Sequence, residues 1–404
     1  MKIAQIAPPW IPIPPDNYGG TENVLYHLVE ELVAQGHEVT LFAPGDAQTS
    51  AQLVSFFPQA LCKEQVPWYM HMKAYYHLHK TMQYIREQDF DIVHGHLSST
   101  GDMYLFPLLA SLQVPHLITA HSTFPFDKLP GDWQGDADTY FMEWAPKIPI
   151  VTISKSARSQ IEFPLSIIDT VYHGVPMKQF TPRRPQGEPF LVWIGRFVAE
   201  KGAHLAIEAA KRTHLPLRLA GIKDESSPRS LAYFQRKIEP HLDGELIRYV
   251  GTVSHEQKIE LLSQASAFLN PIEWEEPFGM VVLEAMAVGC PVIAFARGAM
   301  PEIIEHGKTG FLVHNLDEMV EYIPRIATLQ RTRIRRHVQR HFSAEVMVRR
   351  YLAIYKQLIR QAQQEVEQEQ TVEIAAQTLP VSSREQSSAR LSSSPTQTSR
   401  ASTQ

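Results

Sequence analysis

Residues 267–295 constrain the fold of this chain more than any other stretch. Ala267 to Asn270 is a short apolar run, residues 277–288 have a helical composition, and Pro291 to Phe295 is a second apolar run. A strand, a helix and a strand in this order form a βαβ unit, in which the two strands are parallel. A chain that repeats this unit forms a parallel sheet with helices on both faces.

The helix of this unit has a predicted start and end. Pro277 suits the first helical position and Gly289 is placed to stop the helix, so we expect it to run from about Pro277 to Val288. The first N–H groups of a helix have no partner inside it and carry the positive end of the helix dipole, so they form a binding site for an anion such as a diphosphate. Here these N–H groups belong to Phe278, Gly279, Met280 and Val281.

Two glutamates lie close to this anion site. Glu276 directly precedes the predicted helix, and Glu284 lies about two turns further along the chain. Carboxylates accept hydrogen bonds from hydroxyl groups, so one glutamate is placed to bind a sugar and the other a ribose. For an isolated pair of glutamates, a helix cap and a solvated side chain would be the simpler interpretation.

The chain also opens with a strand, a helix and a strand, predicted at residues 2–7, 21–35 and 38–43. Gly19 and Gly20 place bare backbone at the start of that helix, where an anion binds by the same mechanism. The pair lacks the G-x-G-x-x-G pattern of dinucleotide-binding folds, and a Gly-Gly pair alone is more often only a turn.

Two cations follow another predicted strand, residues 190–194. Arg196 and Lys201 lie five positions apart in a loop bounded by Gly195 and Gly202. Arg binds phosphate in a bidentate manner and Lys supplies a compact charge, so together they would stabilise negative charge on a diphosphate. Taken singly, such residues are more often solvated surface charges.

Three segments resemble elements of one enzyme family. The string E-P-F-G-M-V-V-L-E-A-M-A-V-G-C-P-V-I-A, residues 276–294, closely resembles the signature of retaining glycosyltransferase family 4. G-G-T-E at residues 19–22 and G-R-F-V-A-E-K-G at residues 195–202 are similar to two further elements of that family. The resemblance covers roughly residues 1–360. It implies an α/β protein of the GT-B architecture, in which two Rossmann-like, doubly wound parallel-sheet domains face a central cleft.

The resemblance also implies a function and a set of site residues. The function is transfer of a hexosyl group from a nucleotide-sugar, UDP- or GDP-linked, to a hydroxyl of a glycan, lipid or small molecule, with retention of configuration and without a metal. The nucleotide-sugar is then a co-substrate, and no other cofactor is expected. The implied catalytic residues are Glu276, His121, Arg196 and Lys201. The implied donor-binding residues are Gly19, Gly20, Gly251, Val253, Phe278, Gly279, Met280, Val281 and Glu284.

His121 ends the predicted strand 116–121, from which its side chain would donate a hydrogen bond to a donor-sugar hydroxyl. A lone histidine in such a place is ordinarily structural. Two other functions remain open at this point: a nucleotide-sugar epimerase of the same architecture and a non-catalytic nucleotide-sugar-binding protein.

The turn-rich segment 181–189 is the predicted domain boundary. We expect an N-terminal Rossmann-like acceptor-side domain at residues 1–180 and a C-terminal nucleotide-sugar-binding domain at residues 190–342. A helix at 343–361 is expected to cross back to the first domain, followed by a disordered polar tail at 362–404.

Composition and charge exclude several other functions. The 38 Lys and Arg are nearly balanced by 43 Asp and Glu, so no nucleic-acid partner is expected. The scattered histidines do not have the spacing of a zinc site. Asp136-Ala-Asp138 has the D-x-D spacing of metal-dependent transferases, but we predict no metal because helix ends and cations already balance the phosphate.

The expected location is the cytoplasm. Only two cysteines occur, and no apolar stretch reaches the length that spans a membrane. Residues 68–86 combine Tyr and Met with Lys and Arg, so this predicted helix is a candidate for peripheral contact with the inner face of a membrane. Simple packing of the same helix on the sheet is the alternative.

Overall fold

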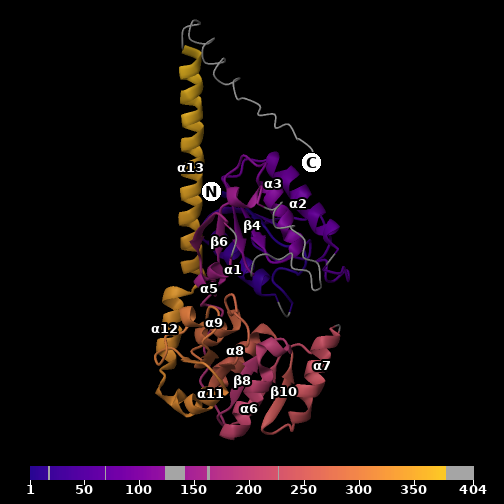
Figure 1. Ribbon diagram of the computed structural model, residues 1–404, viewed down its shortest axis with the longest axis vertical. Helices are drawn as coiled ribbons and strands as arrows, with labels where there is room; N and C mark the ends of the chain where they lie inside the picture. The colour runs from indigo at the N-terminus through magenta and orange to yellow at the C-terminus, as the bar shows by residue number, and fades with distance from the viewer. Residues whose placement is uncertain (17–18, 69, 123–141, 162–163, 226, 379–404) are drawn as a thin grey trace, which may run out of the picture. The chain divides into compact units, whose positions relative to one another are not determined.

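The computed structural model describes residues 1–16, 19–68, 70–122, 142–161, 164–225 and 227–378 (Figure 1). Met1–Ile354 form one compact unit, and Tyr355 begins a second one. The first unit contains two separate parallel sheets, one of seven strands and one of six. The predicted α/β class with two doubly wound sheets is therefore confirmed.

The first sheet is built from the N-terminal part of the chain and has the order β3-β2-β1-β4-β5-β6-β7. All of its neighbouring strands pair in parallel. Its central strands are buried along almost their whole length, which explains their continuous apolar sequences. The strands are β1 (Lys2–Ile6), β2 (Glu38–Phe42), β3 (Gln52–Val54), β4 (Ile92–Leu97), β5 (His116–Ala120), β6 (Ile150–Thr152) and β7 (Ile167–Thr170).

The second sheet has the order β10-β9-β8-β11-β12-β13 and is also parallel throughout. The strand order reverses beside β8, so the loops that follow β8 and β11 lie at the position where doubly wound folds bind ligands. The strands are β8 (Leu191–Ile194), β9 (Leu217–Ala220), β10 (Ile247–Gly251), β11 (Ala267–Asn270), β12 (Val292–Phe295) and β13 (Phe311–Val313).

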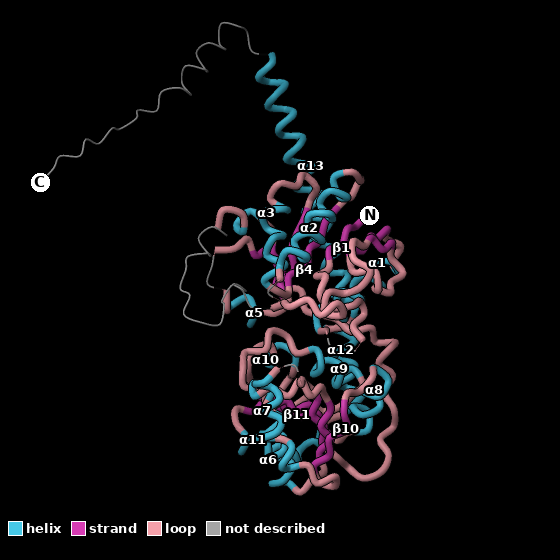
Figure 2. Tube along the Cα trace, turned by 90° about the vertical axis from the view of Figure 1, so that its right-hand side faces the viewer, coloured by secondary structure: helices cyan, strands magenta, loops and turns pink. Residues whose placement is uncertain are grey.

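Helices connect the strands and cover the sheets; Figure 2 shows them in cyan around the magenta strands. The α-helices are α1 (Gly20–Ala34), α2 (His71–Arg86), α3 (Leu105–Leu109), α5 (Lys155–Ser159), α6 (Ala203–Thr213), α7 (Pro228–Lys237), α8 (His255–Gln264), α9 (Met280–Ala287), α10 (Met300–Ile303), α11 (Leu316–Tyr322), α12 (Arg331–His341) and α13 (Ala344–Thr378). Short 3₁₀ helices are η1 (Thr100–Tyr104), η2 (Ala145–Lys147), η3 (Ala199–Lys201), η4 (Glu239–His241) and η5 (Ile323–Thr328).

Two predicted helix boundaries were wrong. Helix α9 begins at Met280, not at Pro277, because Gly279 has a φ of 95°, which a right-handed helix does not accommodate. Helix α13 continues to Thr378, past the predicted end at 361. Its extension is rich in Gln, Glu and Ala, which favour a helix even where there is no core to bury. Residues 379–404 of the predicted disordered tail lie outside the described residues.

The beginning of α13 contacts the first sheet. The Tyr351 hydroxyl hydrogen bonds to Thr119 Oγ1 on β5 at 2.9 Å, and its ring centroid lies 4.9 Å from that of His94 on β4. Tyr351 is almost completely buried there. The last helix of the compact unit therefore completes the core of its first sheet.

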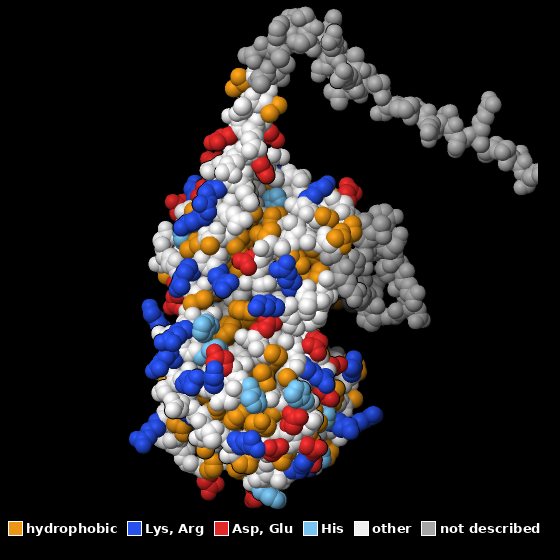
Figure 3. Space-filling model, turned by 60° about the vertical axis from the view of Figure 1, so that its left-hand side comes forward, with side chains coloured by type: hydrophobic (Ala, Val, Ile, Leu, Met, Phe, Trp, Pro, Cys, Tyr) orange, Lys and Arg blue, Asp and Glu red, His pale blue; other side chains and the backbone are white. Residues whose placement is uncertain are grey.

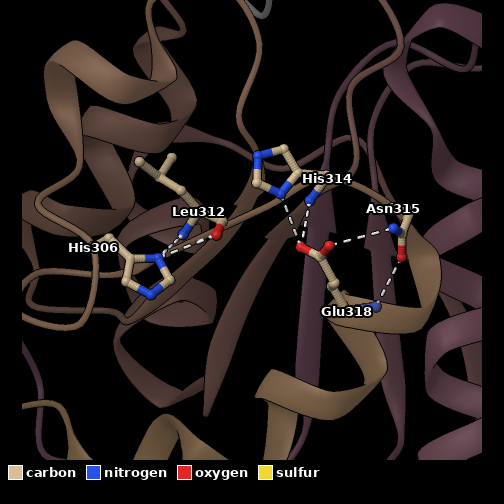
Figure 4. A network of polar contacts seen from close by, with 5 residues as sticks. All are labelled: His306, Leu312, His314, Asn315 and Glu318. Atoms are coloured by element: carbon tan, nitrogen blue, oxygen red, sulfur yellow. Dashed lines mark hydrogen bonds and ion pairs between the residues drawn. The ribbon is translucent and has the colours of Figure 1, made fainter.

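Helix α11 follows β13 of the second sheet, and side chains next to its first turn fix where it begins (Figure 4). Asn315 Oδ1 accepts from the N–H of Glu318 at 2.9 Å, while the Glu318 carboxylate accepts from the N–H of His314 at 2.9 Å. The first bond satisfies an N–H group of the first helical turn, and the second ties the residue before the cap to the same turn. The hydrogen bond from the His314 N–H also lowers the pKa of Glu318.

Candidate active site

The loop before α9 is held against the first sheet. Ser154, which follows β6, donates a 2.6 Å hydrogen bond from Oγ to the carbonyl of Pro277. Glu302 on α10 accepts hydrogen bonds from the N–H groups of Lys155 and Ser156, both at 2.8 Å, and from the Tyr172 hydroxyl at 2.8 Å. Loops after strands of both sheets therefore meet at residues 276–279.

Lys201 and Glu276 are in direct contact in this region. Lys201 Nζ donates to Glu276 Oε2, and Trp274 Nε1 donates to the same oxygen at 3.0 Å. Lys201 Nζ also lies 5.1 Å from the Trp274 ring centroid. The two charged side chains are only 18% and 14% exposed, so each would be costly to leave without a partner.

The loop that carries Lys201 has a fixed position. Gly202 adopts a φ of 69°, and a Cβ atom at this residue would lie 1.9 Å from the carbonyl oxygen of Pro271. Only glycine permits this approach. The Lys201 carbonyl accepts a hydrogen bond from Trp193 Nε1 at 3.0 Å. The backbone of Lys201 is therefore attached to β8 and to the loop after β11.

The backbone of Glu276 is held from its other side by the loop after β12. Ala299 N–H donates to the Glu276 carbonyl at 3.0 Å. Gly298 has a φ of 57°, and a Cβ atom there would lie 2.2 Å from the Glu276 carbonyl oxygen. Consequently the carboxylate of Glu276 projects from a loop whose backbone has little freedom.

Glu284 forms a second buried ion pair. Its Oε1 accepts from Lys258 Nζ on α8 at 2.7 Å, and its side chain is only 4% exposed. The other carboxylate oxygen, Oε2, is buried without a hydrogen-bond partner among the described residues. Lys258 was not among the predicted site residues. Little in the sequence marks Lys258 as a site residue, because it is a single cation in a helix, five residues after Val253.

Helix α9 starts three residues later than predicted. Val282 and Leu283 donate to the carbonyl of Gly279, so the first helical N–H groups are those of Met280 and Val281. Phe278 is a core residue whose ring lies 4.8 Å from that of His173. The anion site predicted at the N–H groups of Phe278, Gly279, Met280 and Val281 stays a prediction.

His121 lies at the carboxyl end of β5 and is 8% exposed. Its Nε2 is 2.8 Å from His96 Nδ1, and its ring stacks on His173 with centroids 5.1 Å apart. Burial lowers its pKa to about 3, so the ring is neutral near pH 7. Through His173 it belongs to the same group of rings as Phe278.

The remaining predicted residues lie at other loops. Gly19 is the N-cap of α1, and a Cβ there would lie 2.8 Å from Glu22 Oε2. Gly251 ends β10 with a φ of 80°, and Val253 is half-buried after it. Arg196 follows β8 with an exposed side chain. Among the residues that the structure describes, no direct contact joins Gly19 or Gly20 to the Lys201–Glu276 pair.

The part of the chain that the structure describes contains no cluster of metal-binding side chains. Within the described ranges, no three His, Cys, Asp or Glu side chains are grouped so as to hold a metal ion. Asp136 and Asp138 belong to residues 123–141, which lie outside the described residues.

A cavity of about 350 Å³ lies at the amino ends of β1 and β2, and none of the candidate site residues lines it.

Comparisons with known proteins give a consistent result. The family model "Glycosyltransferase Family 4" matches residues 18–179, and the model "Glycosyl transferases group 1" matches residues 176–340. Spore coat protein SA of Bacillus subtilis is 24% identical over 88% of this chain and 99% of its own length. The GPI3 subunit of yeast phosphatidylinositol N-acetylglucosaminyltransferase is 24% identical over 72% of this chain and 68% of its own length.

Solved structures share the fold. Sucrose-phosphate synthase from Thermosynechococcus elongatus matches with a TM-score of 0.73 and 21% identity, over 88% of this chain and 98% of its own. HepE from Anabaena, in complex with UDP-glucose, matches with a TM-score of 0.67 and 16% identity, over 88% of this chain and all of its own. These likenesses show that the chain shares the fold of these structures.

Proposed function

Because the chain belongs to the group 1 glycosyltransferases of family 4 and has their GT-B fold, we propose that it transfers a hexosyl group from a nucleotide-sugar to an acceptor hydroxyl with retention of configuration. The observation that carries this proposal is the contact between Lys201 and Glu276 where loops of both sheets meet. A cation for a diphosphate and a carboxylate for sugar hydroxyls are thereby side by side. The binding of UDP-glucose by HepE, which has the same fold, supports a UDP- or GDP-linked donor.

Each proposed residue has a defined task. Arg196, Lys201 and the N–H groups at the start of α9 bind the diphosphate and stabilise the charge that grows on it as the sugar leaves. Glu276 and His121 hold sugar hydroxyls, and Glu284 holds the ribose. The backbone at Gly19, Gly20, Gly251 and Val253 contacts the diphosphate and the base.

The proposed reaction takes place on one face of the sugar. The bond between the anomeric carbon and the diphosphate oxygen breaks as the acceptor oxygen bonds to the same carbon. The acceptor proton passes to the leaving phosphate, so atoms and charge balance without a protein nucleophile. In this proposal Lys201 and Arg196 would balance the charge of the phosphate, which is the basis for proposing a metal-independent reaction.

Incubation with a panel of UDP-, GDP- and ADP-sugars tests the function. We expect slow nucleotide release from one donor, faster release with its acceptor, and the same rates with EDTA. Loss of activity in EDTA that Mg²⁺ or Mn²⁺ restores would contradict metal independence. An isomerised nucleotide-sugar would indicate an epimerase, and binding without turnover under any acceptor would indicate a non-catalytic binding protein.

The acceptor-side domain carries exposed apolar side chains that fit a lipid surface. Helix α2 buries one face, including Leu78 and Met82, so it packs on the sheet as the alternative interpretation proposed. Its other face and the loop before it expose Trp68, Met70, Met72, Tyr75 and Tyr76. The helix itself contains Lys73, Lys80 and Arg86 and no Asp or Glu. Exposed aromatic rings beside cations are typical of contact with anionic lipid headgroups. Among the described residues, no helix is long and apolar enough to cross a bilayer.

Vesicle flotation tests this contact. We expect the protein to float with vesicles of anionic lipid at low salt, and Met72→Ser with Tyr76→Ser to reduce the bound fraction about tenfold, since two apolar side chains are removed from the interface. Val366→Ser with Ile374→Ser, which changes exposed apolar residues of α13, is the matched control. Equal flotation of both double variants would contradict a lipid-binding role for α2.

A further inference from the structure

Three buried polar side chains form a continuous row across the first sheet. Gln5 lies on β1, His96 on β4 and His121 at the end of β5. Gln5 Oε1 is 2.8 Å from His96 Nε2, and His96 Nδ1 is 2.8 Å from His121 Nε2. Gln5 and His96 are at most 1% exposed.

The row has a direction, because each bond needs one donor and one acceptor. The amide oxygen of Gln5 only accepts, so His96 carries its proton on Nε2. Burial holds the pKa of His96 well below its usual value, so the ring is neutral and its Nδ1 is an acceptor. His121 must then donate from Nε2. Since His121 is neutral too, its Nδ1 has a lone pair and no proton.

The Nδ1 atom of His121 is buried and has no hydrogen-bond partner among the described residues. A buried acceptor without a partner is unfavourable, so it marks a place where a bound molecule would supply the missing donor. His173 stacks on the same ring and contacts Phe278, next to the loop that carries Glu276. The unpartnered atom therefore belongs to the candidate active site and not to a remote part of the core.

We propose that Gln5 and His96 are positioning residues that fix His121 as a hydrogen-bond acceptor for a hydroxyl group of the donor sugar. This inference rests on the proposed function and specifies it further, since the sequence had suggested that His121 donates. A sugar hydroxyl is a suitable partner because its O–H donates to Nδ1 while its oxygen accepts from a different group.

The tautomer can be measured in the absence of any substrate. In protein with ¹⁵N-labelled histidine, NMR should show His121 with its proton on Nε2 and Nδ1 unprotonated. In His96→Leu the Nε2 proton loses its acceptor, so a mixture of both tautomers is expected. In His96→Asn the side-chain oxygen still accepts from His121, so the wild-type tautomer should remain. A proton on Nδ1 of His121 in the wild-type protein would overturn the inference, whether or not the enzyme is active.

Kinetics with deoxygenated donors provides the functional test. We expect His96→Leu to lower kcat/KM about tenfold with the full donor, as for loss of one well-placed hydrogen bond, and His96→Asn to restore most of it. With the monodeoxy donor that lacks the contacted hydroxyl, wild type and His96→Leu should be equally slow. If His96→Leu lowered kcat/KM by the same factor with every monodeoxy donor, His96 would have a purely structural role.

His94→Asn is the matched control, because His94 is equally buried on the same strand and its ring lies 4.1 Å from that of His96, while its ring Nε2 is 2.7 Å from Thr119 Oγ1. This variant should keep both the His121 tautomer and the discrimination among deoxy donors. If no nucleotide-sugar is a substrate, the proposed function is wrong, but the NMR spectrum still shows which tautomer His121 adopts. Failure of the proposed function and failure of the inference about His121 are therefore distinguishable.

Discussion

Replacing Glu276 by Gln is expected to lower kcat/KM by about 100- to 1000-fold, the effect of removing one positioned polar group from a reacting site. The amide keeps the size of the side chain and an oxygen that accepts from Trp274 Nε1, but Lys201 loses its charged partner, so the melting temperature should also fall. What is lost is the negative charge that orients Lys201 and binds sugar hydroxyls. Steady-state kinetics with the preferred donor, together with a thermal melt, measures both quantities.

Two further variants make this experiment specific. Glu275→Gln is the matched control, because Glu275 is an exposed neighbour whose carboxylate accepts from the Gly298 N–H. Its activity should stay within about twofold of wild type. Lys201→Met should be as damaging as Glu276→Gln, and the double variant little worse than either, since the two side chains act as a unit. Wild-type rates in Glu276→Gln would remove Glu276 from the site.

Acid should unfold the protein sharply below pH 6.5. Burial lowers the pKa of ten of the described histidines. In the six most deeply buried ones the pKa falls to about 4 in His77, to about 3 in His27 and His121, and well below 6.5 in His94, His96 and His173. Between these values and about 6.5 the unfolded chain binds more protons than the folded protein, so stability falls as the pH falls.

Two buried carboxyl groups act in the opposite direction. Burial raises the pKa of Glu22 to about 7 and that of Asp102 to about 6, so the folded protein binds protons there first and gains stability as the pH falls. For the six histidines and two carboxyl groups together, the net loss of stability between pH 7 and pH 5.5 is about 5 kcal/mol, comparable with the whole stability of an ordinary domain.

Denaturant titrations at a series of pH values measure this loss. In His77→Asn the free energy of unfolding should fall by about 1 kcal/mol less than in the wild type between pH 7 and pH 5.5, because one buried titrating group is removed. His214→Asn is the control: His214 is exposed, and Asn tolerates its positive φ of 53°. A stability that stays constant from pH 7 to pH 5 would show that these histidines bind protons in the folded protein as readily as in the unfolded chain.

Most of the fold follows from the sequence because its signals are local. Strands β1, β5 and β8 lie within the predicted ranges 2–7, 116–121 and 190–194, since continuous apolar runs between turn residues mark buried parallel strands. Strands β3 and β7 were not predicted. Both are edge strands with half-exposed residues, so the apolar signal is too weak.

The candidate site was only partly accessible from the sequence. Glu276 and Lys201 stand out because they lie in motifs, and the structure places them in contact. Lys258 and Gln5 act through partners that are distant in sequence, Glu284 and His96. One usable signal was overlooked: Ile-Val-His-Gly-His-Leu places two histidines on one face of a fully buried strand, where a polar partner is required.

The mixed charge of the surface agrees with the balanced composition; Figure 3 shows Lys and Arg interspersed with Asp and Glu on one face. Such a surface favours solubility without a single-sign field that would steer a polyanion.

The contact between Tyr351 and Thr119 joins residues 232 positions apart, and it has a consequence for biosynthesis. At about 5–20 residues per second, a ribosome needs roughly 10 to 45 s to make the intervening chain. During that time the nascent first sheet lacks the helix that covers His94 and Thr119. Its exposed surface is then a natural site for chaperone binding until translation reaches the final helix.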